Sequence, residues 1–227
     1  MTSPSAAVRP IESRSVTEQV AAELRRSILS GSLAPGQEFS LRDMANMLQV
    51  SFIPVREALR VLEGEGLVII RPGRSAMVAP LDLDDLRAIY RLRRILEPEI
   101  AQRSCLLLSD QDLDALEKQT AEFGDEQRGI HEIYEGHHAF HLALLRPAAT
   151  AWDIRMLTTL WRAAERYIRI GFAKLDPDPE EHHRRQRLHQ EMVAAFRLRD
   201  PSAAAEAMER HLAGNEQTAL IALEDEA

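Results

Sequence analysis

The sequence predicts a mainly α-helical protein with two domains, and three observations lead to this prediction. Apolar residues recur at helical spacing over most of the chain, except in two short apolar runs between residues 67 and 79. Residues 1–80 contain nine arginines, no lysine and eight acids, whereas residues 81–227 contain nineteen basic residues and twenty-eight acids. All eight histidines lie beyond residue 130. We therefore expect an N-terminal domain over residues 14–80 and a C-terminal domain over residues 81–227, with different roles.

The composition excludes several classes of protein. Of the 227 residues, 45% are hydrophobic, which is too many for a disordered chain, and no apolar run approaches a membrane span of ~18–20 residues. The single cysteine, Cys105, excludes a disulfide framework and indicates a free thiol in a reducing compartment. Residues 1–11 show no signal-peptide pattern, so we expect a cytoplasmic protein. Residues 1–13, rich in Ser, Pro and Ala, are expected to form a flexible tail.

Two short helices are predicted at the start of the first domain. Ser15 and Glu18 have the spacing of a capping box, and the apolar residues after them recur every three or four positions. This helix is expected to end at Gly31, because glycine favours the backbone conformation that terminates a helix. After a turn, Ser40 and Asp43 mark the start of a second helix.

A third helix and a β-hairpin complete the first domain. Pro54 suits the first turn of the third helix, and Gly66 ends it. Residues 67–70 and 76–79 are short apolar runs typical of strands, and residues 71–75 form the turn between them. Three small helices followed by a hairpin predict a winged helix-turn-helix, a unit that binds double-stranded DNA.

Helical patterns cover the whole of the second domain. Asp82 with Asp85 marks the start of a helix over about 83–104, and Ser109 marks another that extends to about 124. Charged faces alternate with Leu, Ala and Ile stripes, which is typical of an antiparallel all-helical bundle. We expect about six helices, of which the remaining four cover about 129–145, 151–173, 179–199 and 201–222.

The start of the third helix contains candidate DNA-reading residues. In a helix-turn-helix, the N-terminal residues of the recognition helix lie nearest the base edges in the major groove. Here these residues include Ser51 and Arg56, with Arg60 one turn further on. An arginine at such a position donates a bidentate pair to guanine, which discriminates by about 1–3 kcal/mol. The alternative is that both arginines are solvated side chains beside acids such as Glu57.

Four runs between residues 25 and 78 identify the family that the first domain resembles. They are Ile28-Leu29-Ser30-Gly31, Leu33-Ala34-Pro35-Gly36, Pro54-Val55-Arg56-Glu57-Ala58-Leu59 and Leu62-Glu63-Gly64-Glu65-Gly66-Leu67. In these runs and their spacing, the domain resembles the GntR family of bacterial transcription regulators. The resemblance implies DNA contacts by Arg42, by Arg56, and by Gly73 at the tip of the wing with Arg74 beside it. A physical argument also favours glycine at position 73, because a wing tip that lies against phosphates needs a small residue with an unrestricted φ angle.

The sequence departs from the family before the third helix. Relatives often have Ser-Arg-Thr where this chain has Ser51-Phe52-Ile53. An arginine that reads a base or a phosphate is therefore absent. Phe52 either contacts a thymine methyl or packs within the domain, and we favour packing.

Four histidines of the second domain are candidate metal ligands. His137 and His141 lie four residues apart, so both rings project from one face of a predicted helix. His189 and His211 lie within two later helices. Imidazole is the commonest metal ligand in proteins, and histidines from several helices form a sensible site in a bundle core. The alternative is a set of hydrogen-bonded core histidines.

The run His137-His138-Ala139-Phe140-His141 supports the metal hypothesis. With it, residues 83–222 resemble the FCD effector domain of the FadR subfamily, which commonly carries an Asp-x-x-Phe-His metal motif and two later histidines. The resemblance implies that His137 replaces the aspartate and that the other three ligands are His141, His189 and His211. Four neutral ligands favour Zn²⁺ or Ni²⁺ over Mg²⁺ or Ca²⁺. His138 is a competing ligand by position, and the remaining histidines, His131, His182 and His183, are expected on the surface.

The same resemblance implies a binding site for a small organic acid. Arg93 matches a family arginine that faces the effector cavity, and a buried guanidinium is well suited to a carboxylate. The alternative for Arg93 is an intrahelical ion pair with Glu97, four residues further on.

Taken together, the two domains predict a transcription regulator, and more specifically a repressor. Its operator binding would be controlled by a small organic acid bound at the metal-containing helical domain. One winged head reads too few base pairs for specificity, so we expect a homodimer on a palindromic operator. The alternatives are a metal sensor, in which the metal is the signal, and a metal-dependent hydrolase. No His-Glu-x-x-His pattern occurs, and an enzyme gives no reason for the winged head, so we expect no enzymatic activity.

Overall fold

The computed structural model describes residues 15–73, 75–125, 130–173 and 179–224. The chain divides into two compact units, with the main boundary between Ala79 and Pro80; residues 29–31 group with the second unit. The flexible tail expected over residues 1–13 lies outside the described residues.

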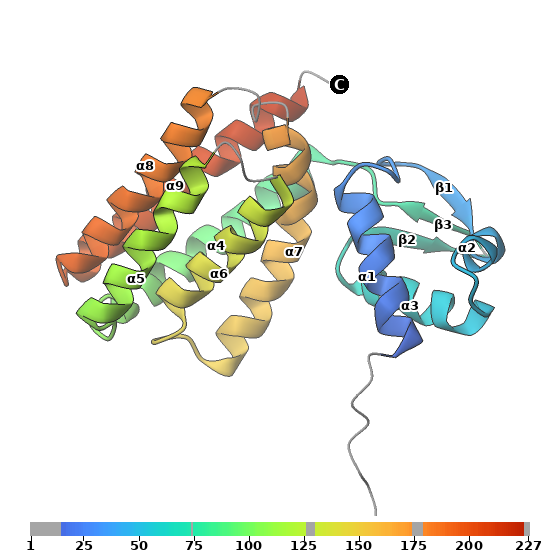
Figure 1. The fold of residues 1–227 in the computed structure, drawn as a ribbon, viewed down its shortest axis with the longest axis horizontal. Helices are drawn as coiled ribbons and strands as arrows, with labels where there is room; N and C mark the ends of the chain where they lie inside the picture. Colours follow the sequence, from blue (N-terminus) through green and yellow to red (C-terminus); the bar gives the residue numbers. More distant parts are fainter. Residues whose placement is uncertain (1–14, 74, 126–129, 174–178, 225–227) are drawn as a thin grey trace, which may run out of the picture. The chain divides into compact units, whose positions relative to one another are not determined.

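The first unit has the order helix, strand, helix, helix, strand, strand (Figure 1). The capping box at its start is present: the Glu18 amide donates to the Ser15 hydroxyl (3.1 Å), and the Ser15 amide donates to the Glu18 carboxylate (2.8 Å). Ser40 caps the second helix by accepting from the amides of Arg42 and Asp43. The elements are α1 (Val16–Leu29), β1 (Glu38–Ser40), α2 (Leu41–Met47), α3 (Phe52–Gly64), β2 (Val68–Arg71) and β3 (Ser75–Val78).

The sheet of the first unit has three strands, where the sequence predicted two. Its order is β1-β3-β2, and β3 pairs antiparallel with both neighbours. Met77 of β3 lies opposite Ile69 of β2 on one side and opposite Glu38 of β1 on the other. The third strand was missed because β1 has only three residues, which is too short for an alternating pattern to be visible. The wing is thus supported along one edge by the segment that precedes α2.

The second unit confirms the prediction of a helical bundle. Its helices begin and end within about two residues of the predicted positions, except that the helix after Ser109 ends at Thr120 instead of about 124. A short 3-10 turn over Ala121–Gly124 follows that helix. No helix within the described residues has the apolar length that a membrane span requires. The helices are α4 (Leu83–Ser104), α5 (Asp110–Thr120), α6 (Ile130–Leu145), α7 (Ala151–Ala173), α8 (Pro179–Arg197) and α9 (Pro201–Glu224).

Helix α4 packs against three others, α6, α7 and α9, and so forms the centre of the bundle (Figure 1). Its neighbour α7 runs antiparallel to it, because Asp85 near the start of α4 accepts from Tyr167 near the end of α7, and Glu97 accepts from Trp161. The core between the helices is apolar and closely packed. Its largest fully buried side chains are Tyr90, Phe123, Phe140, Tyr167 and Phe196.

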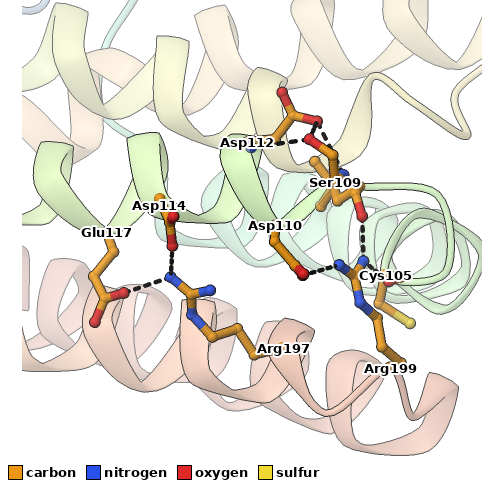
Figure 2. A network of polar contacts seen from close by, with 9 residues as sticks. Cys105, Ser109, Asp110, Asp112, Asp114, Glu117, Arg197 and Arg199 are labelled. Atoms are coloured by element: carbon orange, nitrogen blue, oxygen red, sulfur yellow. Dashed lines mark hydrogen bonds and ion pairs between the residues drawn. The ribbon is translucent and has the colours of Figure 1, made fainter.

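Two arginines at the end of α8 join that helix to α5 and to the turn before it (Figure 2). Arg199 donates to the carbonyl oxygen of Cys105 (2.9 Å), to that of Leu108, and to the carboxylate of Asp110 (2.8 Å). Arg197 makes two exposed ion pairs with acids of α5. Arg199 therefore satisfies carbonyls that the end of α4 and the following turn leave without helical partners.

Candidate DNA-binding and metal sites

The recognition helix α3 has one buried face and one charged face. Arg56 and Arg60 lie on the solvent side, with 46% and 61% of their side chains exposed. Each contacts Glu57, at 3.3 Å. Exposed ion pairs of this kind contribute about 0–1 kcal/mol, so both guanidinium groups can exchange Glu57 for a phosphate or a base. The buried stripe on the other side consists of Val55, Ala58, Leu59 and Leu62.

The structure places most of the other predicted DNA contacts on the surface of the same unit. Ser51 is the N-cap residue of α3, and Arg42 lies exposed in the first turn of α2. Gly73 occupies the turn between β2 and β3 with φ of +97°, a conformation that favours glycine. Arg74 lies outside the described residues.

A groove of about 490 Å³ runs between α3 and the wing. Arg56 and Arg60 border it from the helix, while Arg71 and Ser75 border it from the hairpin. Arg71 and Ser75 were not among the predicted DNA contacts, although their places at the two ends of the hairpin turn could have indicated them. Phe52 lies half-buried in the groove, where Leu41 and Ile70 also line the wall, which supports packing over base contact for that ring. The arginines give the groove the charge that a DNA backbone requires.

The four candidate ligands of the second unit lie together in its core. His137 and His141 are on α6, His189 is on α8 and His211 is on α9. One ring nitrogen from each histidine lies within 4.8 Å of those of the other three. The ring centroids of every pair are 4.4–5.8 Å apart. Three of the rings are at most 4% exposed, and His137 is half-buried.

The protonation of these rings suits metal binding. Burial, followed by neighbouring charges, holds the pKa of His137, His141 and His211 well below the ordinary value. Burial lowers the pKa of His189 to about 4. All four rings are therefore neutral near pH 7, which is the form that binds a metal.

Several ring nitrogens of the cluster have no hydrogen-bond partner within the described residues. Nδ1 of His189 donates to the carbonyl oxygen of Arg185 (2.6 Å), which leaves the lone pair on its Nε2. Nε2 of His137 and Nε2 of His141 lie 3.3 Å apart. Within the described part of the chain, Nε2 of His189, Nδ1 of His141 and Nδ1 of His211 are buried and have no hydrogen-bond partner. Buried polar atoms are rarely left in this way, so the donor set fits a divalent transition metal.

Two other histidines occupy different environments. His138 stacks on Trp161, with ring centroids 5.9 Å apart, and is not part of the cluster. His182 is only 4% exposed, so its expected surface position was wrong. It accepts a hydrogen bond from Arg185 (3.1 Å), because the start of α8 turns this side chain toward the protein.

Arg93 forms the buried ion pair that the sequence analysis kept as an alternative. Its Nε donates to Glu97 (2.7 Å), and the two side chains are 3% and 0% exposed. Nε1 of Trp161 donates to the same carboxylate oxygen (2.9 Å). The role of Arg93 in effector binding stays a prediction.

A small cavity adjoins the histidine cluster. Its volume is about 20 Å³, enough for about one or two water molecules. Two of the histidines, His137 and His189, line it, together with Tyr134, Arg185, Asn215 and three apolar residues. Asn215 also lies 3.0 Å from Nε2 of His211. The sequence analysis did not single out Arg185 or Asn215, although each lies four residues from a candidate ligand on the same helix.

Two protein-family models match the chain. The model of bacterial regulatory proteins of the gntR family matches residues 16–78, and the model of the FCD domain matches residues 88–214. The chain belongs to the GntR family. As a GntR regulator, it is a DNA-binding transcription regulator and not an enzyme.

This GntR regulator is similar to other HTH-type transcriptional regulators over most of its length. It is 29% identical over 209 residues to the HTH-type transcriptional regulator BphR of Paraburkholderia xenovorans, covering 88% of this chain and 83% of BphR. It is 28% identical over 201 residues to the HTH-type transcriptional repressor RspR of Escherichia coli, covering 87% and 86%. The solved structure of E. coli McbR superposes with a TM-score of 0.71 at 23% identity, covering 90% of this chain and 99% of McbR. That likeness shows the shared fold.

Proposed function

We propose that this GntR regulator is a repressor of the FadR subfamily whose DNA binding depends on a divalent transition metal and a small organic acid. The observation that carries the proposal is the cluster of four neutral histidines in the core of the FCD domain. The name of RspR, a transcriptional repressor, supports the sign of regulation.

The metal would be held by His137, His141, His189 and His211. Nitrogen ligands of this kind favour Zn²⁺ or Ni²⁺. The absence of a carboxylate among the four leaves the charge of the ion uncompensated, which favours an anionic effector. When bound, the metal would supply an electrophilic anchor for a carboxylate oxygen.

The effector would bind where the small cavity adjoins the cluster. Arg185 and Asn215 offer donors there, and Arg185 suits a carboxylate better than a neutral group. The cavity holds only about one or two water molecules, so binding of an organic acid requires the surrounding side chains and helices to move apart. That requirement provides a link to DNA binding, because an effector that favours one conformation shifts the population toward it.

Metal sensing is the second candidate function, and the small size of the cavity beside the histidine cluster favours it. Four protein ligands complete the tetrahedral shell that Zn²⁺ adopts in structural sites, and the adjoining space admits only water-sized ligands. In that case the metal would itself be the signal. The two candidates differ in their response to small carboxylic acids. The first requires that an acid changes the DNA affinity of the metal-loaded protein. The second requires that only the metal changes the DNA affinity.

A homodimer would bring two winged heads to one palindromic operator. Two neighbouring helices of the second unit expose large apolar side chains that a second copy could cover. On α4, Leu92 and Ile95 are 39% and 59% exposed, and on α7, Trp152 and Met156 are 68% and 48% exposed. We propose that this α4–α7 face is the dimer contact. Sedimentation of the full chain at assay concentrations distinguishes a dimer from a monomer.

Metal analysis tests the proposed site. We expect purified protein, dialysed against Zn²⁺ or Ni²⁺, to retain about one ion per chain. The double variant His137→Ala/His189→Ala removes half of the ligands and is expected to lose the ion. The matched control is His183→Ala, which removes an exposed histidine of α8 and is expected to retain it. Full occupancy in the double variant would refute the ligand assignment.

A further inference from the structure

Ile53 lies at the start of the solvent face of the recognition helix. Its side chain is 62% exposed, in the first turn of α3. Arg56 and Arg60 follow at three and seven residues, so all three side chains project from one face. Val55 and Leu59 belong to the buried stripe on the opposite side. An exposed aliphatic side chain therefore shares a face with Arg56 and Arg60 and lies nearer the start of the helix than either arginine.

The local structure offers no packing reason for isoleucine at this position. A β-branched residue has a lower helix propensity than the polar residues usual on an exposed turn. The neighbouring Phe52 turns into the groove beside Leu41, and Ile53 is absent from the lining of that groove. Single exposed apolar residues are common on protein surfaces, so exposure alone means little. Ile53, however, lies in the first turn of the recognition helix, and that turn lies nearest the base edges in the major groove. Its exposure there indicates a contact with DNA.

We propose that Ile53 contacts the C5-methyl group of a thymine in each operator half-site and thereby specifies a T·A pair. In the major groove thymine is the one base of DNA that presents a methyl group, and an aliphatic side chain can bury it. Arg56 and Arg60, which follow Ile53 on the same face, provide the charge that brings the duplex to this face. The inference rests on the proposed function, since it requires that α3 reads a specific DNA sequence.

Deoxyuridine substitution tests the contact, because it removes the methyl group and keeps every hydrogen-bonding group of thymine. A duplex is first selected from a random pool by the full-length protein, and each thymine is then replaced singly. At one position in each half-site, we expect deoxyuridine to weaken binding about fourfold, and about 15-fold when both half-sites are changed. Fluorescence anisotropy of labelled duplexes measures the affinities. In Ile53→Ala the thymine and deoxyuridine duplexes are expected to bind equally.

The control variant is Val61→Ala, which removes another exposed β-branched side chain from α3, eight residues further from the helix start. It is expected to keep the full methyl dependence. The inference is overturned if no thymine position is sensitive in the parent protein, if the selected half-site contains no thymine, or if Ile53→Ala keeps the same sensitivity. Failure to select any sequence would instead overturn the proposed sequence-specific function, and the inference with it.

Discussion

Replacing Arg93 by methionine tests how the core of the FCD domain is stabilised. Arg93 and Glu97 are almost completely buried, and the distance between Nε and Oε1 is 2.7 Å. Methionine is similar in length to the arginine stem but has no charge. In the variant, Glu97 is left as a buried carboxylate whose one remaining donor among the described contacts is Nε1 of Trp161.

The expected magnitude follows from this burial. Removing one partner of a buried ion pair costs about 3–5 kcal/mol, because the other charge stays uncompensated. For a domain of this size, such a loss lowers the melting temperature by about 10 °C. Glu97→Gln is expected to cost a comparable amount, since it strands the guanidinium of Arg93. The double variant Arg93→Met/Glu97→Gln removes both charges and is expected to recover most of the stability, because neither ion then remains buried.

Urea unfolding followed by tryptophan fluorescence is the appropriate assay. The two tryptophans, Trp152 and Trp161, both lie on α7, so their signal reports the helical domain and not the winged head. A loss below about 1 kcal/mol in Arg93→Met would refute the reasoning, because it would mean that the carboxylate needs no buried cation. A double variant as unstable as the sum of the single variants would contradict the coupling between the two side chains.

Two further predictions concern stability. In protein freed of metal by a chelator, the free energy of unfolding is expected to fall as the pH is lowered from 7 to 5. The pKa of His189 is about 4 in the folded protein and 6.5 for the ordinary group. Because the unfolded chain therefore binds a proton at a higher pH than the folded protein does, lowering the pH favours unfolding. His189 alone is expected to lower the free energy of unfolding by roughly 2 kcal/mol at pH 5. Urea titrations that show equal stability at pH 7 and pH 5 would contradict this prediction. Arg199→Ala is expected to cost about 2 kcal/mol, because three acceptors lose a charged donor. Arg197→Ala, the matched control, removes exposed ion pairs and is expected to cost less than about 1 kcal/mol; equal losses in thermal unfolding would refute the distinction.

The sequence predicted those features that depend on neighbouring residues. The capping box at Ser15 and the helix cap at Ser109 are present because a cap needs a side chain and an amide only three residues away. Most helix bounds were accurate for the same reason, since glycine, proline and the capping residues act locally, whereas the predicted end of α5 lay four residues too late. The pair His137 and His141 belongs to this class, because helical geometry alone brings their rings together.

Features that depend on distant segments were harder to predict. Strand β1 exists through its pairing with β3, almost forty residues later, and three residues carry no pattern of their own. The meeting of α6, α8 and α9 at the histidine cluster followed from family resemblance and not from spacing. Burial of His182, and the place of Arg185 beside the cavity, depend on how α8 packs against the bundle, which an amphipathic pattern interrupted by arginines and histidines does not reveal.

The dependence of DNA affinity on the histidine cluster tests the central claim most directly. Anisotropy titrations of a selected duplex would compare Zn²⁺-loaded and chelated protein, in the parent chain and in His137→Ala/His189→Ala. We expect the parent's Kd to change on removal of the metal, and the double variant to show one Kd under both conditions. Arg56→Ala, with its metal site intact, is expected to bind at least about fivefold more weakly in either state. An equal Kd for loaded and chelated parent protein, with metal occupancy verified, would contradict the account.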